Sequence, residues 1–356
     1  MWMWNAMTQT CEHAILVDRL NGTLLGTALG DALGLPAEGM RAKAIRRRFG
    51  QMNRFRLLGR TGFVSDDTEQ AALVAQSLAR HLDQPEACVL AFRRALLGWF
   101  CRLPWGIGLA TLRSCLRIAL RLEPSGVMSA GNGAAMRAAI IGVCFHDRPT
   151  DRRLFTQALA QVTHRDPRAV EGALYVAELA ALSSSAPPDV SAQTLVNTAR
   201  TVITNSELDA ALTQAIELAA RGASVEEAAI TCGTSGYVVC TLAFATFCFL
   251  RFPNDPMQAL SEALGAGGDT DSIGAILGAW LGARHGEKSL PAALINKIHD
   301  GPFGPTHLRA LASCLANRLA GRDEPAPRFS IAAALTRNLA LYPVILVHGF
   351  RRLVPF

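Results

Sequence analysis

Residues 20–34, LNGTLLGTALGDALG, and residues 267–282, GGDTDSIGAILGAWLG, decide the fold of this 356-residue chain. Glycines recur every four residues in both stretches, at Gly22, Gly26, Gly30 and Gly34 and at Gly274, Gly278 and Gly282. In an α-helix this spacing places each set on one face. A glycine inside a helix costs roughly 1 kcal/mol relative to alanine, and close approach of two helix backbones compensates for that cost. We therefore expect the helices that carry Asp31 and Asp271 to lie deep in the fold, near one another.

The fold class follows from the spacing of apolar residues. They recur at helical intervals along most of the chain, and convincing alternating strands are absent. We predict an all-α protein with a single compact helical bundle over residues 18–320, preceded by an N-terminal extension over residues 1–17. Residues 321–327, GRDEPAP, are typical of a linker. We expect the rest of residues 321–356 to form an amphipathic helix that packs on the body, with a membrane-surface role as the alternative.

The composition is typical of a cytoplasmic globular protein. Hydrophobic residues make up 50% of the chain, which excludes a largely disordered protein. The nine cysteines include no Cys-x-x-Cys pair, so we expect a reduced protein whose thiols are mostly buried. Residues 1–4 lack the basic segment and long apolar run of a signal peptide, and no segment has the roughly 20 apolar residues of a membrane span. We expect a cytoplasmic monomer.

The net charge of +6 is concentrated in one run of basic residues between Arg41 and Arg56. Such a run is usually a solvated face, and attraction to a phosphate-bearing or acidic partner is the alternative. Only Phe55 lies among these basic residues, so they offer no platform for stacking bases. We expect no nucleic-acid partner.

Two short acidic clusters, Ser65-Asp66-Asp67-Thr68 and Gly267-Gly268-Asp269-Thr270-Asp271-Ser272, lie about 200 residues apart, each at the start of a helical pattern. Their four carboxylates would repel one another if the fold brought them together, and a divalent cation would relieve that repulsion. Hard ions such as Mg2+ and Mn2+ take oxygen ligands, including hydroxyl groups and waters. Helix capping is the alternative for either cluster alone, because Ser, Thr and Asp favour helix N-termini. The pair of clusters favours a metal site.

Three further polar segments lie between the acidic clusters. Gly131, Asn132 and Gly133 form a turn before a helix, where backbone N–H groups can bind a phosphate. His164 stands between two helices and is either a ligand-binding residue or a surface or capping residue. The Gly233–Tyr237 turn carries one of three tyrosines, whose ring would suit an adenine or ribose or else lie in the core.

Taken in order, these motifs resemble the ADP-ribosylglycohydrolase family. The resemblance covers roughly residues 18–315 and is carried by Gly26–Gly34, Glu38, Ser65–Thr68, Gly131–Arg137, His164 and Gly267–Ser272. It implies an all-α, roughly orthogonal helical fold with two Mg2+ or Mn2+ ions at the base of a cleft. Members of the family commonly have threonine where this chain has Ser65 and Ser272, and serine retains the hydroxyl oxygen.

The resemblance also assigns roles to individual residues. It implies that the metal ligands are Ser65, Asp66, Asp67, Asp269, Asp271 and Ser272. It gives catalytic roles to Glu38, Asp66, Asp67 and Asp269. It implies that ADP-ribose is bound by Gly131, Asn132, Gly133, His164, Gly233, Ser235, Gly236, Tyr237, Gly267 and Gly268.

Hydrolysis of the N-glycosidic bond between ADP-ribose and a protein side chain, arginine above all, is the function that the resemblance implies. The partner would then be an ADP-ribosylated protein. A protein that binds and occludes an ADP-ribosylating toxin is the alternative from a different class, and such a steric binder would have no need of an intact metal set. A metal-dependent phosphoesterase would fit the carboxylates but not the ordered motifs.

Overall fold

Two helices that touch through their glycine faces form the centre of the protein. The computed structural model describes the backbone of residues 2–353 and the side chains of residues 11–347, 349 and 350. Helices α1 (Trp2–Gly34) and α14 (Thr270–His285) run antiparallel, because Gly22 faces Gly282 at one end and Gly34 faces Thr270 at the other. A methyl group at Gly26 would lie 2.1 Å from the carbonyl oxygen of Gly278. The expectation that these helices lie deep and adjacent is confirmed.

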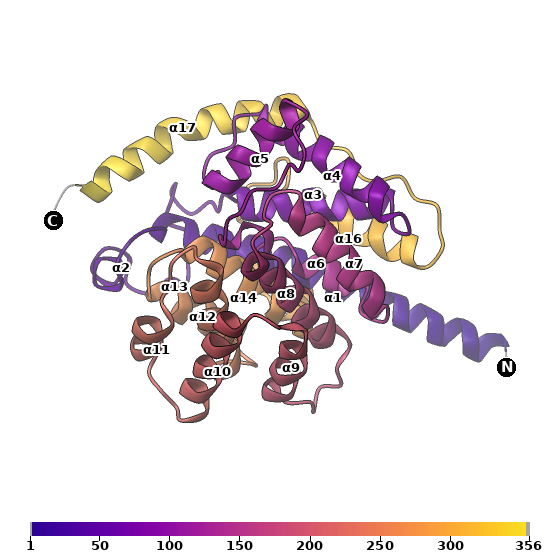
Figure 1. Ribbon diagram of the computed structural model, residues 1–356, viewed down its shortest axis with the longest axis horizontal. Helices are drawn as coiled ribbons and strands as arrows, with labels where there is room; N and C mark the ends of the chain where they lie inside the picture. The colour runs from indigo at the N-terminus through magenta and orange to yellow at the C-terminus, as the bar shows by residue number, and fades with distance from the viewer. Residues whose placement is uncertain (1, 354–356) are drawn as a thin grey trace.

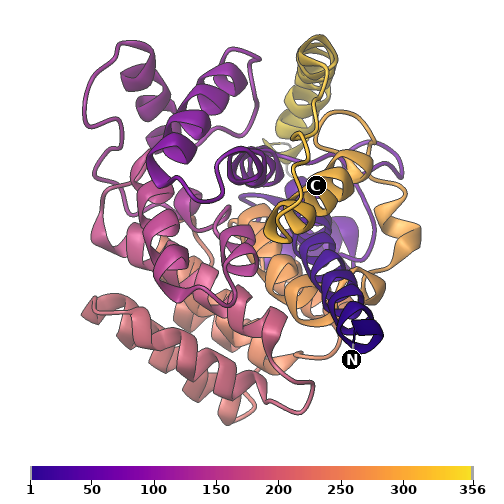
Figure 2. The ribbon, with the colours of Figure 1, turned by 90° about the vertical axis from the view of Figure 1, so that its right-hand side faces the viewer.

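Six helices surround this pair. They are α3 (Asp66–Arg80), α6 (Ala139–Cys144), α8 (Pro167–Ser185), α12 (Val238–Arg251), α13 (Pro256–Gly265) and α16 (Pro305–Leu319), each in contact with α1, α14 or both. Viewed toward the N-terminal end of α1, α16 lies directly beside it (Figure 2). The N-terminal part of α1 extends beyond the other helices (Figure 1).

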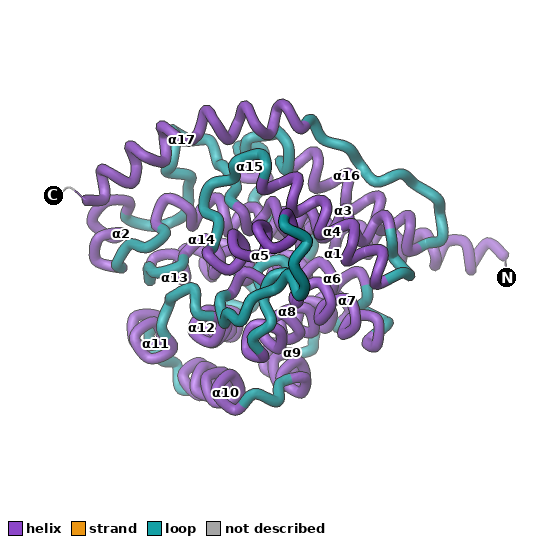
Figure 3. Tube along the Cα trace, turned by 45° about the horizontal axis from the view of Figure 1, so that its top comes forward, coloured by secondary structure: helices purple, strands orange, loops and turns teal. Residues whose placement is uncertain are grey.

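The remaining helices complete the outer layer. They are α2 (Ala42–Phe49), α4 (Pro85–Phe100), α5 (Leu109–Ala119), α7 (Pro149–Gln161), α9 (Ala192–Ala199), α10 (Ser206–Ala220), α11 (Val225–Cys232), α15 (Ala292–Ile295) and α17 (Ile331–Leu353), with 3-10 turns η1 (Leu35–Ala37), η2 (Asn132–Ala134), η3 (Arg200–Val202) and η4 (Glu287–Ser289). Within residues 2–353 there are isolated bridges but no strand, so the predicted all-α class is confirmed (Figure 3). Six of the nine cysteines are buried, and all nine are free thiols.

The antiparallel pair brings the two acidic clusters to one end of the molecule. The C-terminal end of α1 meets the start of α14, where the Thr270 hydroxyl donates to the Gly34 carbonyl at 2.8 Å. Directly after α1, Gly39 N–H donates to the Gly268 carbonyl at 2.7 Å, and Gly268 N–H donates to the Met40 carbonyl at 2.9 Å. These bonds hold Glu38 beside the second acidic cluster.

Helix α17 lies across the edge of the bundle, reached through a linker without regular structure (Figure 1). Its inner face buries Asn338 and Leu341, while Leu339 on the same helix is 51% exposed. Among the described residues, no helix is long and apolar enough to cross a lipid bilayer.

We expect Gly26→Ala to destabilise the fold by at least about 3 kcal/mol, because the new methyl group would overlap the Gly278 backbone, which cannot move aside cheaply. Gly265→Ala, at the end of α13, is the matched control because its methyl group would meet no atom within 4 Å. Urea unfolding followed by circular dichroism measures both changes. Equal stability of the two variants would contradict the role given to the glycine contact.

Candidate active site

A pocket of about 570 Å³ opens at the end of the molecule where α1, α3 and α14 meet. Carboxylates line its base, and a glycine turn and a histidine line its wall. The residues concerned are Glu38, Asp66, Asp67, Asp269 and Asp271, with Gly131, Asn132, Gly133, His164, Ser235, Gly236, Gly268 and Ser272. The structure therefore brings together most of the site residues expected from the sequence.

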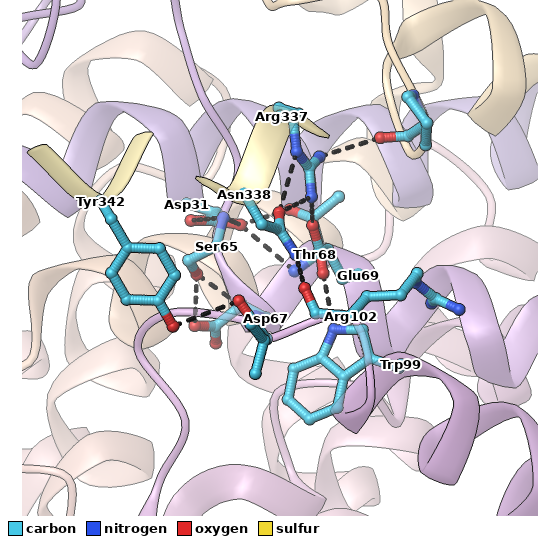
Figure 4. A network of polar contacts seen from close by, with 12 residues as sticks. Asp31, Ser65, Asp67, Thr68, Glu69, Trp99, Arg102, Arg337, Asn338 and Tyr342 are labelled. Atoms are coloured by element: carbon cyan, nitrogen blue, oxygen red, sulfur yellow. Dashed lines mark hydrogen bonds and ion pairs between the residues drawn. The ribbon is translucent and has the colours of Figure 1, made fainter. Parts of the chain in front are cut away.

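The first acidic cluster is the N-terminus of α3. Ser65 is its N-cap, and its hydroxyl oxygen accepts from Asp67 N–H at 3.3 Å. Asp31 of α1 also accepts from the N–H groups of Ser65 and Thr68, at 2.9 and 3.2 Å (Figure 4). The helix start is thus capped by groups other than Asp66 and Asp67. The carboxylates of these two residues remain available at the pocket.

In the second acidic cluster, the side chain at the N-cap position does not cap its helix. Asp269 occupies the N-cap position of α14, yet its side chain makes no capping bond and accepts instead from Asn132 Nδ2 at 2.6 Å. Oxygen atoms of Glu38, Asp269 and Asp271 all lie within 4.8 Å of one another. These three residues can hold a metal ion.

Burial and mutual repulsion shape the electrostatics of the site. Desolvation is the largest cause, and the charges of neighbouring carboxylates the next, that raise the pKa values of Asp66, Asp67 and Asp271 well above the usual value for aspartate. Burial also raises the pKa of Asp31 to about 6. Asp67 Oδ1 is buried and has no hydrogen-bond partner. A set of oxygen donors with excess negative charge and one unpartnered oxygen fits a hard divalent cation.

The wall of the pocket next to Asp269 is built from Gly131–Gly133 and His164. A methyl group on Gly133 would lie 2.9 Å from the His164 ring, so the turn approaches the imidazole closely because it has no side chain there. His164 is buried rather than a surface residue, and its Nδ1 contacts the Thr163 hydroxyl at 2.8 Å. Burial and then the charge of Arg137 lower the pKa of His164 to about 3, which makes it a neutral hydrogen-bonding group.

Four of the expected residues lie outside the pocket wall. The Tyr237 ring lies beneath the Arg168 guanidinium, 5.5 Å away, and its hydroxyl donates to Glu207 at 2.5 Å. Gly233 packs against Cys240, and Gly267 against the backbone of residues 40–42. Ser65 stands behind Asp67, where its hydroxyl donates to Asp67 Oδ2 at 3.1 Å.

Three residues without a predicted role organise the site. Asp31 ties α1 to the start of α3, as described above. Gln70 donates to Asp66 Oδ2 at 3.1 Å, and Arg137 donates both to Gln70 and to the Gly133 carbonyl at 2.8 Å. Asp31 carried a signal in the sequence, because it is the one charged residue in the glycine-spaced stretch 20–34.

Comparisons with known proteins agree with this geometry. The sequence model of the ADP-ribosylglycohydrolase family matches residues 12–326, most of the chain. The chain belongs to the ADP-ribosylglycohydrolase family. The resemblance stated from the motifs is confirmed, and so is the fold expected of an ADP-ribosylglycohydrolase.

Relatives of this ADP-ribosylglycohydrolase-family chain are distant but extend over most of its length. An uncharacterised protein of Archaeoglobus fulgidus is 30% identical over 295 residues, covering 80% of this chain and 93% of the relative. The ADP-ribosyl-[dinitrogen reductase] glycohydrolase of Rhodospirillum rubrum is 26% identical over 291 residues, covering 79% and 90%. A solved structure titled "ADP-ribosylglycohydrolase-related protein complex" matches with a TM-score of 0.68 and 27% identity, over 86% of this chain and 99% of the other.

Mg2+ or Mn2+ is expected to raise the melting temperature more at pH 8 than at pH 5.5. The folded-state pKa values of Asp66, Asp67 and Asp271 lie above their unfolded values, so the stability linked to their protons is present at low pH and is lost as pH rises. A cation replaces those protons at pH 8. At 100 times its Kd it would stabilise the fold by about 2.7 kcal/mol, roughly 4 °C.

Differential scanning fluorimetry measures this shift, with Asp67→Asn as the control that removes one charged oxygen and reduces the gain. An equal gain at both pH values, or none at either, would contradict the assignment of a cation to these carboxylates.

Proposed function

We propose that this chain is a metal-dependent hydrolase that cleaves the N-glycosidic bond between ADP-ribose and an arginine side chain of a protein. The observation that carries the proposal is the convergence of Glu38, Asp66, Asp67, Asp269 and Asp271 in one pocket, together with the Gly131–Gly133 turn. Family membership and the named activity of the Rhodospirillum rubrum relative support the same reaction.

The residues proposed to hold two Mg2+ or Mn2+ ions are Asp66, Asp67, Asp269, Asp271 and Ser272. Ser65, also expected as a ligand, lies behind Asp67 and would instead hold that carboxylate in place through its 3.1 Å hydrogen bond. When bound, such ions supply Lewis acidity that polarises substrate oxygens and lowers the pKa of a water. Asn132 would hold Asp269 in position through its 2.6 Å hydrogen bond. Asp31 would do the same for Asp66 and Asp67 by fixing the start of α3.

The substrate would lie between the carboxylates and the glycine turn. The Gly131 and Asn132 N–H groups already donate, to the Ser129 hydroxyl at 3.3 Å and to the Gly236 carbonyl at 3.0 Å, so the side-chain-free surface of the turn would pack against the ADP-ribose. Neutral His164 can exchange hydrogen bonds with ribose hydroxyls without repelling a cationic reaction centre. We place Ser235, Gly236 and Gly268 along the same wall. Gly233, Tyr237 and Gly267 would support that wall from behind.

Water would attack the anomeric carbon of the ribose while the bond from that carbon to the guanidine nitrogen breaks. A carboxylate of Glu38, Asp66 or Asp67 accepts the proton of the water. Positive charge develops on the ribose ring in the transition state, and the acidic base of the pocket stabilises it. The electron pair of the broken bond stays on the guanidine, which leaves with little assistance because it is readily protonated.

The buried charges favour catalysis over steric occlusion of a toxin. Asp66, Asp67 and Asp271 are each at most 8% exposed, so their desolvation and mutual repulsion oppose folding. A protein that acted only by covering a partner would have no use for this arrangement. A hydrolase does, because the same carboxylates hold the cation and take up the proton.

Release of ADP-ribose from an arginine-ADP-ribosylated protein tests the proposal. We expect release by the wild type with Mg2+ and a loss of at least about 100-fold in Asp66→Ala/Asp269→Ala. Asp83→Ala, at a side chain that is 78% exposed, is the control that keeps full activity. Chromatography of the released nucleotide measures the rate.

Serine-linked ADP-ribose is assayed in parallel to define the linkage. Cleavage of that substrate alone would overturn the assignment to arginine. Absence of release from either substrate by the wild type would overturn the enzymatic function.

A further inference from the structure

Helix α17 lies at the edge of the bundle but places two polar side chains in the interior. Helix α17 lies beyond residues 12–326, the part matched by the family model. Its residues Arg337 and Asn338 are only 9% and 1% exposed, although both are polar. The Arg337 guanidinium forms an ion pair with Glu69, which is itself 3% exposed and lies in the first turn of α3 (Figure 4).

This ion pair belongs to a largely buried network. Trp99 Nε1 donates to the second Glu69 oxygen at 2.5 Å, and Arg337 Nη1 donates to the Pro302 carbonyl at 3.0 Å. Asn338 Nδ2 donates to the Arg102 carbonyl at 2.8 Å (Figure 4). Glu69 follows Asp66 and Asp67 by one turn or less of helix. The network therefore fixes the helical turn from which those carboxylates project.

An apolar cluster adds a second connection. Leu341 of α17, which is 4% exposed, packs in one cluster with Leu35, Phe63 and Trp105. Each of these three residues lies just before a segment that lines the pocket. Leu35 precedes Glu38, Phe63 precedes Asp66, and Trp105 precedes Gly106.

A third connection runs to the loop beside Asp66. The Tyr342 hydroxyl donates to the Leu103 carbonyl at 3.2 Å and approaches the Pro104 carbonyl at 3.5 Å. Leu103 has a φ of 53°, in the left-handed region that a leucine rarely adopts, so the loop needs support from its surroundings. A methyl group on Gly106 would lie 3.1 Å from Asp66 Oδ1, so this loop forms the pocket wall next to that carboxylate.

We propose that Arg337 and Leu341 are positioning residues for the pocket, and that α17 holds Glu38, the start of α3 and the loop at residues 103–106 in their relative places. The proposal rests on the proposed function where it concerns the cation and the substrate. A buried ion pair is a poor source of stability, because an apolar pair of similar volume usually stabilises a fold as well or better. Its fixed geometry, with two partners on one carboxylate, instead defines the position of α3.

Metal binding by the full-length chain tests the proposal. The variants are Arg337→Met and Leu341→Ala, with Leu339→Ala as the matched control on the same helix, where the leucine is 51% exposed. We expect the Kd for Mn2+, measured by isothermal titration calorimetry well below the melting temperature, to rise at least about 10-fold in the first two variants and by less than about twofold in Leu339→Ala.

Tyr342→Phe provides a milder variant that removes only the hydroxyl group. We expect an unchanged melting temperature and a KM for the ADP-ribosylated substrate that rises about threefold or more with kcat kept, because Gly106 at the end of the loop at residues 103–106 lines the pocket. This split of KM from kcat would not follow from a loss of stability alone, and it can be measured even if the other variants do not fold.

The outcomes separate this inference from the proposed function. A wild type that binds no Mn2+ and releases no ADP-ribose would refute the proposed function. A wild type that binds Mn2+ while folded Arg337→Met and Leu341→Ala bind it equally well would overturn the role of α17. If those two variants do not fold, a Tyr342→Phe variant with wild-type KM would overturn it instead.

Discussion

Backbone contact between α1 and α14 is the constraint on which the rest of the structure depends. Three glycine pairs and the contact of Gly34 with Thr270 bring the two helices closer than any side chain would permit. Because the helices are antiparallel, the end of α1 and the start of α14 coincide in space. The chain that leaves α1 therefore delivers Glu38 to the second acidic cluster. A buried Asp31, one turn before the end of α1, then fixes the start of α3.

This arrangement concentrates negative charge at one end of the molecule, and that charge defines the site. Helix N-termini attract acids, and the fold places two such N-termini, those of α3 and α14, at one pocket. The dipoles of two helices offset only part of the charge of five carboxylates, three of them buried and two half-buried. The raised pKa values of Asp66, Asp67 and Asp271 reflect the negative charge that the helix dipoles do not offset. A hard cation would neutralise this excess negative charge, and the same charge would stabilise a cationic sugar.

The sequence was sufficient for the central helix pair and the acidic clusters, because both depend on residue types that have few other uses. Seven helical glycines at four-residue intervals indicate close packing of two helices and little else. The choice between capping and ligation was not predictable, since Ser65 caps α3 while Asp269 does not cap α14. Tyr237 shows a further limit. Its turn reaches the pocket through Ser235 and Gly236, but its ring lies against Arg168, a partner 69 residues earlier in the chain.

The residues that hold the start of α3 in place differ in whether the sequence alone reveals them. Asp31 lies in a motif that is visible in the sequence, and the groups that it binds are backbone N–H groups of the site itself. Arg337, Asn338 and Leu341 lie in a tail without any motif. Their partners come from α3, from the loop after α4, from Pro302, and from the residues just after α1 and just before α3. Only the tertiary structure brings them together. The shared helical core thus supplies the carboxylates, and α17 holds the same turn of α3 from a second side. A helix start held from both sides has little freedom to move when the charge beside it changes, as it must when a cation or a cationic transition state enters the pocket.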